Sequence, residues 1–238
     1  SNEFTVYVYD RRGRGLSGSY GENYSMKKEC EDLDALLCKT GADKVFGVSS
    51  GALVALQAAF MLPAIHKVAL YEPPLPLNDH PSPTAWVAPY EQSLARGNLG
   101  AAMVSIIKGT GDSSLLTVLP RSLLVPLMTL AIRANAKEVK NDDVPLQALI
   151  PTMRYDAQIV KGMKDTLERF EAMTTDVLLL GGSKSQRYLK DALDGLSRVL
   201  PHAQRIEFAG LGHLAVDNSG KPERVAQELR RFFGEPSM

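Results

Sequence analysis

The sequence has little that would direct it to nucleic acid or to a membrane. Among its 238 residues, 27 lysines and arginines balance 27 aspartates and glutamates, so the formal net charge is zero. Without an excess of positive charge, no electrostatic field favours nucleic acid or an acidic lipid surface. No uninterrupted apolar run reaches the roughly 18 residues of a membrane-spanning helix. We therefore expect a protein of the aqueous phase with neither nucleic-acid nor membrane partners.

Cysteine is also scarce, and its placement excludes two common uses. Cys30 and Cys38 lie eight residues apart in one expected helix. This spacing is typical of neither a metal site nor a disulfide. Two free thiols suit a reducing compartment, so the sequence predicts a cytoplasmic location.

Strand-like apolar runs alternate with helical patterns along the chain. The length suffices for one sizeable α/β domain with a well-buried core. Strands that alternate with helices predict a mainly parallel sheet with helices on both faces. Strands are expected at residues 4–9, 44–48, 67–71, 176–182 and 205–208. Helices are expected at about residues 25–39, 188–200 and 222–233, and a further helix that follows the strand at residues 44–48 should end near residues 61–63.

The pattern changes between residues 75 and 170. Prolines are frequent there, and no strand-like alternation appears. Helical stripes occupy residues 99–107, 115–132 and 146–160. We interpret this stretch as a helical cap inserted into the α/β domain. The expected division is an α/β core at residues 1–74 and 171–238, with the cap at residues 75–170.

A Gly-x-Ser-x-Gly motif stands where an expected strand becomes an expected helix. The β-branched and aromatic run of residues 44–48 leads into the motif, and an alanine- and leucine-rich stretch follows it. Strand, sharp turn and helix are the context of a nucleophile elbow, the turn that exposes a catalytic serine. We expect Ser49 in a strained left-handed conformation. Gly47 and Gly51 should leave room, because a Cβ at either position would crowd the strand–helix crossing.

A glycine-rich loop follows the first expected strand, at residues 10–18. Its glycines are not spaced as Gly-x-Gly-x-x-Gly, and it contains no Gly-Lys-Ser/Thr, so phosphate binding is not expected. We interpret its arginines as parts of a structural loop in which Asp10 pairs locally.

Four pieces of the sequence, in this order, resemble the α/β-hydrolase fold. They are Asp-x-Arg-Gly-x-Gly-x-Ser at residues 10–17, Gly-x-Ser-x-Gly at residues 47–51, the helical insert, and Gly-x-Gly-His at residues 210–213. The resemblance covers nearly the whole chain, and it looks most like small bacterial esterase, lactonase and dehalogenase-type members. It implies a mostly parallel sheet flanked by helices, with an inserted helical cap.

The resemblance also implies a catalytic triad. Ser49 is the expected nucleophile, and His213, in a glycine-flanked loop after the last strand, is the expected general base. Members of the family commonly place an aspartate just after the seventh strand, but residues 181–185 contain no carboxylate. Some dehalogenase-type relatives instead carry a glutamate at the end of the sixth strand, where this chain has Glu72. Glu72 is therefore the expected acid, with Asp217 as the alternative.

An oxyanion hole needs two backbone N–H donors. One is expected from Ser50, directly after the nucleophile. The second normally comes from a His-Gly-type loop after the third strand, and this sequence has no such loop because it opens at what resembles the fourth strand. Residues 4–9 then either pair directly with the strand at residues 44–48 or leave a gap of one strand, roughly 4.8 Å, that another chain or segment fills. Open strand edges of this kind predict a homo-oligomer.

Two functions remain open on the sequence alone. The first is a serine hydrolase that cleaves a small, fairly apolar ester or lactone through an acyl-enzyme, without a metal or organic cofactor. The alternative is a catalytically impaired or non-catalytic binding or interaction protein that keeps the hydrolase shape. The absent oxyanion loop and the absent aspartate favour the alternative, whereas the complete Ser–His pair favours the hydrolase.

Overall fold

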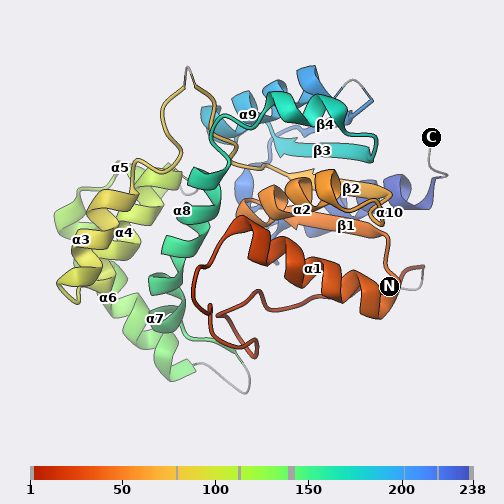
Figure 1. Cartoon of the computed structure of the whole chain (residues 1–238). Helices are drawn as coiled ribbons and strands as arrows, with labels where there is room; N and C mark the ends of the chain where they lie inside the picture. The colour runs from red at the N-terminus through yellow and green to blue at the C-terminus, as the bar shows by residue number, and fades with distance from the viewer. Residues whose placement is uncertain are drawn as a thin grey trace.

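A parallel sheet carries the fold (Figure 1). The computed structural model describes residues 3–78, 80–111, 114–138, 143–200, 202–218 and 220–235. In this part of the chain the sheet has four strands in the order β1-β2-β3-β4, each parallel to the next. The strands are β1 (Lys44–Val48), β2 (Lys67–Tyr71), β3 (Asp176–Gly182) and β4 (Gln204–Phe208). Because the strands are parallel, their carboxyl ends lie along one edge of the sheet.

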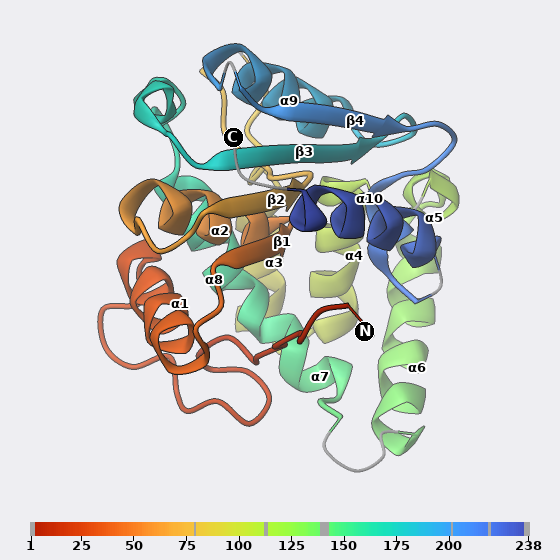
Figure 2. The same ribbon diagram turned by 90° about the vertical axis from the view of Figure 1, so that its right-hand side faces the viewer.

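Helices cover both faces of the sheet (Figure 2). They are α1 (Met26–Thr40), α2 (Ser50–Met61), α9 (Arg187–Val199) and α10 (Pro222–Gly234). Alternate side chains of β2 point to opposite faces. Val68 and Leu70 pack in one apolar cluster with α1, α2 and α9, and Ala69 and Tyr71 pack in a second cluster with α10. The expected α/β fold class is confirmed.

Local sequence signals set the bounds of these helices. α1 begins after Ser25, whose side chain accepts a hydrogen bond from Lys28 N, and ends at Gly41, which has a φ of 71°. α10 begins at Pro222, where the missing N–H costs no bond within the helix. The predicted bounds of α1, α9 and α10 differ from the observed ones by at most one residue, and α2 ends at Met61, within the predicted range of residues 61–63.

Further helices stand together beside the sheet (Figure 1). They are α3 (Val87–Ala95), α4 (Leu99–Thr110), α5 (Ser114–Val118), α6 (Arg121–Glu138), α7 (Leu146–Leu149) and α8 (Met153–Gly162), with short 3-10 turns η1 (Ile150–Thr152) and η2 (Glu168–Ala172). An apolar cluster of their own, around Trp86, Tyr90 and Ile132, is built by residues of α3, α4, α6, α7, η1 and α8. α8 joins it to the sheet, because Ala157 packs in this cluster while Ile159 packs with α1 and α2.

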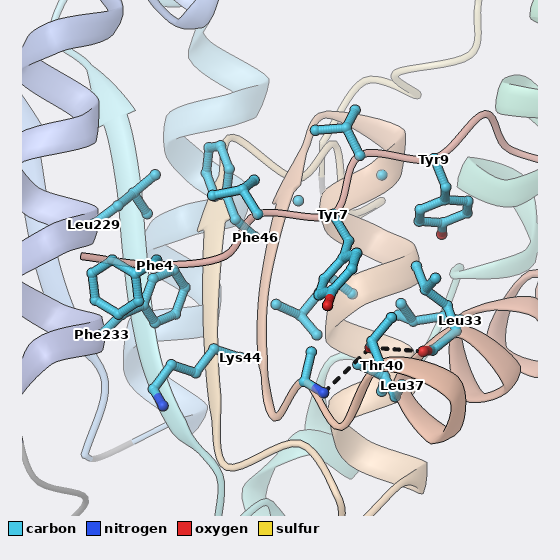
Figure 3. A pocket seen from close by; sticks show the side chains of 18 of the residues that line it. Phe4, Tyr7, Tyr9, Leu33, Leu37, Thr40, Lys44, Phe46, Leu229 and Phe233 are labelled. Carbon is cyan, nitrogen blue, oxygen red and sulfur yellow. Dashed lines mark hydrogen bonds between the residues drawn. The ribbon is translucent and has the colours of Figure 1, made fainter. Parts of the chain in front are cut away.

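The strand predicted at residues 4–9 is not formed, so its direct pairing with β1 is wrong. These residues belong to no strand of the described structure, and Val6 and Val8 are 65% and 92% exposed. They run past the outer edge of β1. A largely apolar cavity of about 540 Å³ lies between residues 4–9 and β1, and Tyr7 and Phe46 line it from the two sides (Figure 3). Valine and tyrosine give the segment strand propensity, but propensity does not supply a backbone partner.

The described residues contain neither a disulfide nor a membrane-spanning helix. Cys30 and Cys38 are both free, as predicted. Burial, reinforced by the charge of Glu29, raises the pKa of the Cys30 thiol to about 12, so this side chain is a protonated part of the core. Cys38 is exposed. None of the described helices combines the length and the apolar character needed to cross a membrane.

Candidate active site

Ser49 occupies the turn between β1 and α2. It has a φ of 53° and a ψ of −125°, a conformation that costs a residue with a Cβ about 1–3 kcal/mol. Backbone hydrogen bonds hold it there, since Ser49 N donates to Tyr71 O at 2.9 Å and Ala52 N donates to Ser49 O at 2.9 Å. The turn thus has the strained strand-to-helix form of a nucleophile elbow.

The two glycines of the motif are not equivalent. A Cβ added to Gly47 would lie 2.5 Å from Gly51 O and 2.7 Å from Ala52 Cα, so the close crossing of β1 and α2 requires glycine there. A Cβ added to Gly51 would meet no atom within 4 Å, because Gly51 faces the cavity beside β1. The predicted crowding is confirmed at Gly47 and wrong at Gly51.

Glu72 and His213 contact each other. Glu72 directly follows β2, is fully buried and has a φ of 48°. Its Oε2 lies 2.7 Å from His213 Nδ1. Because an ionised carboxylate can only accept hydrogen bonds, Nδ1 carries the proton of this bond. Nε2 is then the ring nitrogen that can take up a further proton.

Two more donors hold the other carboxylate oxygen of Glu72. Gly182 N donates to Oε1 at 2.6 Å, and the hydroxyl of Ser185 donates to the same atom. Three donors, including His213, thus compensate the carboxylate for its lost hydration. Sequence reasoning misses Ser185. Residues 181–185 contain no carboxylate of their own, but a hydroxyl from this stretch serves the glutamate that follows the neighbouring strand.

The loop that carries His213 closes against the end of β3. A Cβ added to Gly182 would lie 2.3 Å from Leu211 O, so only glycine permits this approach. Tyr71 OH donates to Gly212 O at 2.8 Å. Burial raises the pKa of the Tyr71 phenol above its ordinary value, so the hydroxyl remains protonated and keeps donating to the loop.

Three strand ends bring these residues to one edge of the sheet. Ser49 follows β1, Glu72 follows β2, and His213 begins the short turn η3 (His213–Val216) in the loop after β4. The carboxyl edge is where open α/β sheets bind their ligands. Asp217, the alternative acid, is exposed at the end of η3. The structure therefore gathers Ser49, Glu72 and His213 at this edge and leaves Asp217 at the surface.

Ser50 is the first residue of α2. Its backbone N–H belongs to the first helical turn, where N–H groups find no carbonyl partner within the helix. Such groups, at the positive end of the helix dipole, favour a negative charge beside them. The chemical groups at this edge are thus hydroxyl, imidazole, carboxylate and backbone N–H. In the part of the chain that the structure describes, no cluster of three or more His, Cys, Asp or Glu side chains could hold a metal ion.

The loop at residues 10–18 is structural, but its arginines bind residues that are distant in the sequence. Asp10 pairs locally as predicted, since its Oδ2 accepts a hydrogen bond from a backbone N–H of the same loop at 2.9 Å. Arg12 forms an ion pair with Asp32 of α1, and Arg11 reaches both α1 and α8. No pattern in the sequence indicates these partners.

The sheet, its two helical layers and the residues at its carboxyl edge place the chain among proteins of the alpha/beta-hydrolase fold. The family model described as the alpha/beta hydrolase family matches residues 1–228. The chain belongs to this family, and the predicted resemblance is confirmed.

Solved structures agree with this assignment. An alpha/beta hydrolase from Sphaerobacter thermophilus is 28% identical, with a TM-score of 0.69, and the match covers 94% of this chain and 80% of that one. An alpha/beta hydrolase enzyme from a Medee basin deep-sea metagenome library is 17% identical, with a TM-score of 0.67 and coverages of 97% and 79%. A meta-cleavage product hydrolase is 16% identical, with a TM-score of 0.62 and coverages of 95% and 79%. No curated protein matches the chain in sequence. Family and neighbours together indicate hydrolase activity on a small molecule.

Proposed function

We propose that this chain is a serine hydrolase that cleaves a small, fairly apolar ester or lactone through an acyl-enzyme. The observation that carries the proposal is the 2.7 Å contact between His213 Nδ1 and Glu72 Oε2, at the same sheet edge as the strained turn of Ser49. A serine hydroxyl is a weak nucleophile near neutral pH and needs an imidazole to take its proton. Membership of the alpha/beta hydrolase family supports hydrolysis as the class of reaction.

In the proposed reaction, Ser49 Oγ attacks the carbonyl carbon while His213 Nε2 takes the hydroxyl proton. The imidazolium then gives this proton to the leaving oxygen as the carbon–oxygen bond breaks, and the acyl group stays on Ser49. Water repeats both steps and releases the acid. Glu72 keeps the imidazole in the productive tautomer and stabilises its charged form, without taking a proton itself. The proposed reaction uses no metal or organic cofactor.

The negative oxygen of the tetrahedral intermediate needs backbone donors. We assign one of them to Ser50 N–H, in the first turn of α2. Loss of one such donor lowers kcat by about 100- to 1,000-fold in well-studied hydrolases. A site with a single donor would therefore still form the acyl-enzyme, at a lower rate.

The proposed substrate class rests on the helical cap. We assign the cap to residues 75–170, with the α/β core on either side of it in the sequence. In α6, Leu123, Leu127 and Leu130 are 62%, 47% and 67% exposed. Their spacing places them on one face of the helix. We propose that this exposed apolar stripe of the cap meets the acyl group of the substrate, which would then be apolar rather than charged.

Reaction with a fluorophosphonate tests this proposal, because the reagent adds to serines that an imidazole activates. We expect one adduct per chain by intact mass, mapped to Ser49 by peptide analysis, and no adduct after denaturation. Hydrolysis of p-nitrophenyl esters with increasing acyl length then measures the preference for apolar groups. A folded chain that takes no adduct would contradict the hydrolase proposal. It would favour the alternative, a binding protein of hydrolase shape.

We propose two further properties, a cytoplasmic location and self-association. Two free thiols suit a reducing compartment. Phe46 of β1 is 38% exposed and lines the cavity of about 540 Å³ at the outer edge of that strand. Unpaired apolar edges promote pairing with another chain. Sedimentation velocity should show a dimer or larger species for the wild type and a shift toward monomer for Phe46→Lys. A wild-type monomer at every concentration would contradict self-association.

A further inference from the structure

A buried network of charged side chains joins the loop at residues 10–18 to α1. Arg11 Nε and Nη2 donate to the two carboxylate oxygens of Glu29 at 3.0 and 2.9 Å, and Tyr24 OH donates to Glu29 at 2.6 Å. Glu29 is only 1% exposed. Burial alone would lower the pKa of Arg11, but the hydrogen bond to Glu29 and the charge of Asp156 raise it above its ordinary value. Arg11 therefore remains charged.

Asp156 brings the cap helix α8 into this network. Its Oδ1 accepts hydrogen bonds from Arg11 Nη1 at 3.0 Å and from Ser50 Oγ at 2.6 Å, and its Oδ2 accepts from Arg14. Asp156 is 8% exposed. Two arginines thus face two carboxylates, so the charges of this poorly hydrated region are balanced. Paired and hydrogen-bonded charges are the form in which buried charges are tolerated.

Ser50 is the residue where this network meets the proposed chemistry. It follows Ser49 directly and begins α2. Its hydroxyl donates to Asp156 and also lies 3.3 Å from Arg11 Nη1. This 2.6 Å hydrogen bond to a buried carboxylate restricts rotation about the Cα–Cβ bond of Ser50 and ties its Cα to α8. The N–H that we assign to the oxyanion is bonded to the same Cα.

α8 is suited to transmit such a restraint, because it packs both against the cap helices and against α1 and α2. Ala157 contributes to the apolar cluster of the cap, while Ile159 and Val160 contribute to the cluster of α1 and α2. Asp156 therefore lies on a helix whose position depends on how the cap meets the sheet. Its bond to Ser50 spans 106 residues of sequence.

We propose that Asp156 is a positioning residue, which fixes the first turn of α2 to the cap helix α8 through Ser50 Oγ. The proposal rests on the proposed function, since the place of Ser50 N–H matters to the rate only if it binds the oxyanion. Movement of α8 away from the sheet would release Ser50, so cap docking and the oxyanion donor are coupled. Misplacement of a catalytic group by about 1 Å can lower a rate by about 100-fold. Partial release should therefore lower kcat and leave KM nearly unchanged.

Ser50→Ala removes the hydroxyl and keeps the backbone N–H, so it is the sharpest test. We expect about a tenfold decrease in kcat for a p-nitrophenyl ester and in the rate of fluorophosphonate addition to Ser49, with KM within about twofold of wild type. Asp156→Asn should lower kcat at least as much. The double variant should match Asp156→Asn within about twofold, because both changes remove the same bond.

Two matched variants separate this restraint from general stabilisation. Ser93→Ala removes a buried hydroxyl of the cap, which donates to Pro89 O at 2.8 Å. Asp32→Asn breaks the ion pair with Arg12, which joins the same loop to α1. Neither contact includes Ser50 or Asp156, so both variants should keep the wild-type kcat. Hydrogen exchange of the peptide that contains the first turn of α2 should be faster in Ser50→Ala and unchanged in both controls.

The outcomes distinguish this proposal from the proposed function. If the wild type is labelled and Ser50→Ala reacts at the wild-type rate with unchanged exchange, the positioning role is overturned and the hydrolase stands. If Ser50→Ala and Asp156→Asn lower kcat multiplicatively in the double variant, Asp156 does not act through Ser50. If the wild type takes no adduct, the hydrolase fails. In that case only hydrogen exchange can test whether Asp156 restrains the first turn of α2. Faster exchange in Ser50→Ala would support the restraint, and unchanged exchange would overturn it.

Discussion

Replacement of Ser49 by alanine is expected to lower ester hydrolysis by a factor on the order of 10⁴ to 10⁶. The variant removes the only atom that can form the acyl-enzyme in the proposed mechanism, and His213 then has no hydroxyl to deprotonate. Alanine carries the same Cβ as serine and meets the same backbone strain at a φ of 53°, so the fold should persist. Steady-state kinetics with a p-nitrophenyl ester, beside thermal unfolding of both proteins, would measure the effect.

Ser93→Ala is a suitable control for that experiment, because it removes a buried hydroxyl from α3. It should retain wild-type turnover and fluorophosphonate labelling. Ester hydrolysis that persists in pure, folded Ser49→Ala at more than about a hundredth of the wild-type rate would show that another group is the nucleophile. Peptide mapping of the adduct would then identify that group.

Replacement of Glu72 by glutamine is expected to lower kcat by a factor of about 10⁴, by analogy with the loss of the triad carboxylate in serine proteases. The glutamine keeps the shape of the side chain and loses its charge. Its amide can present an N–H to His213, and this would hold the imidazole in the wrong tautomer. The hydrogen bonds from Gly182 N and Ser185 to the other oxygen can remain. A lower kcat with intact folding would therefore indicate that Glu72 acts by setting the tautomer and charge of the His213 imidazole.

Asp217→Asn is the matched control for Glu72→Gln, because it makes the same kind of change at the alternative acid. Asp217 is exposed, so we expect kcat within about twofold of wild type and an unchanged unfolding midpoint. The reverse result, with a large loss in Asp217→Asn and little in Glu72→Gln, would transfer the role of the acid to Asp217. Thermal unfolding of Glu72→Gln is needed beside the kinetics, since this side chain is fully buried.

Local signals explain what could be predicted from the sequence. The strand, the Gly-x-Ser-x-Gly turn and α2 are contiguous, so residue order alone indicates the strained position of Ser49. Ser25 and Gly41 mark the ends of α1 in the same way. His213 could be placed by its glycine-flanked loop after the last strand. Glu72 could be singled out only through resemblance to the family, and its catalytic role remains a prediction.

Contacts between distant residues explain what could not be predicted. Arg11 and Asp156 are 145 residues apart, and no spacing in the sequence connects them. Ser185 meets Glu72 across 113 residues, although the two follow neighbouring strands. The prediction of a strand at residues 4–9 fails because it too depends on a distant part of the chain. Their composition favours a strand, but strand formation depends on a neighbouring backbone that the composition cannot reveal.

The position of helices α3 to α8 between β2 and β3 has a consequence for the order of folding. β1 and β2 are separated by residues 49–66, whereas β2 and β3 are separated by residues 72–175. Closing the longer loop costs about 1.5 kcal/mol more in chain entropy. Glu72 finds its hydrogen-bond partners only on the far side of that loop. Early folding of these helices around their own apolar cluster would shorten the loop, so we expect them to speed the later step that assembles the surroundings of Glu72.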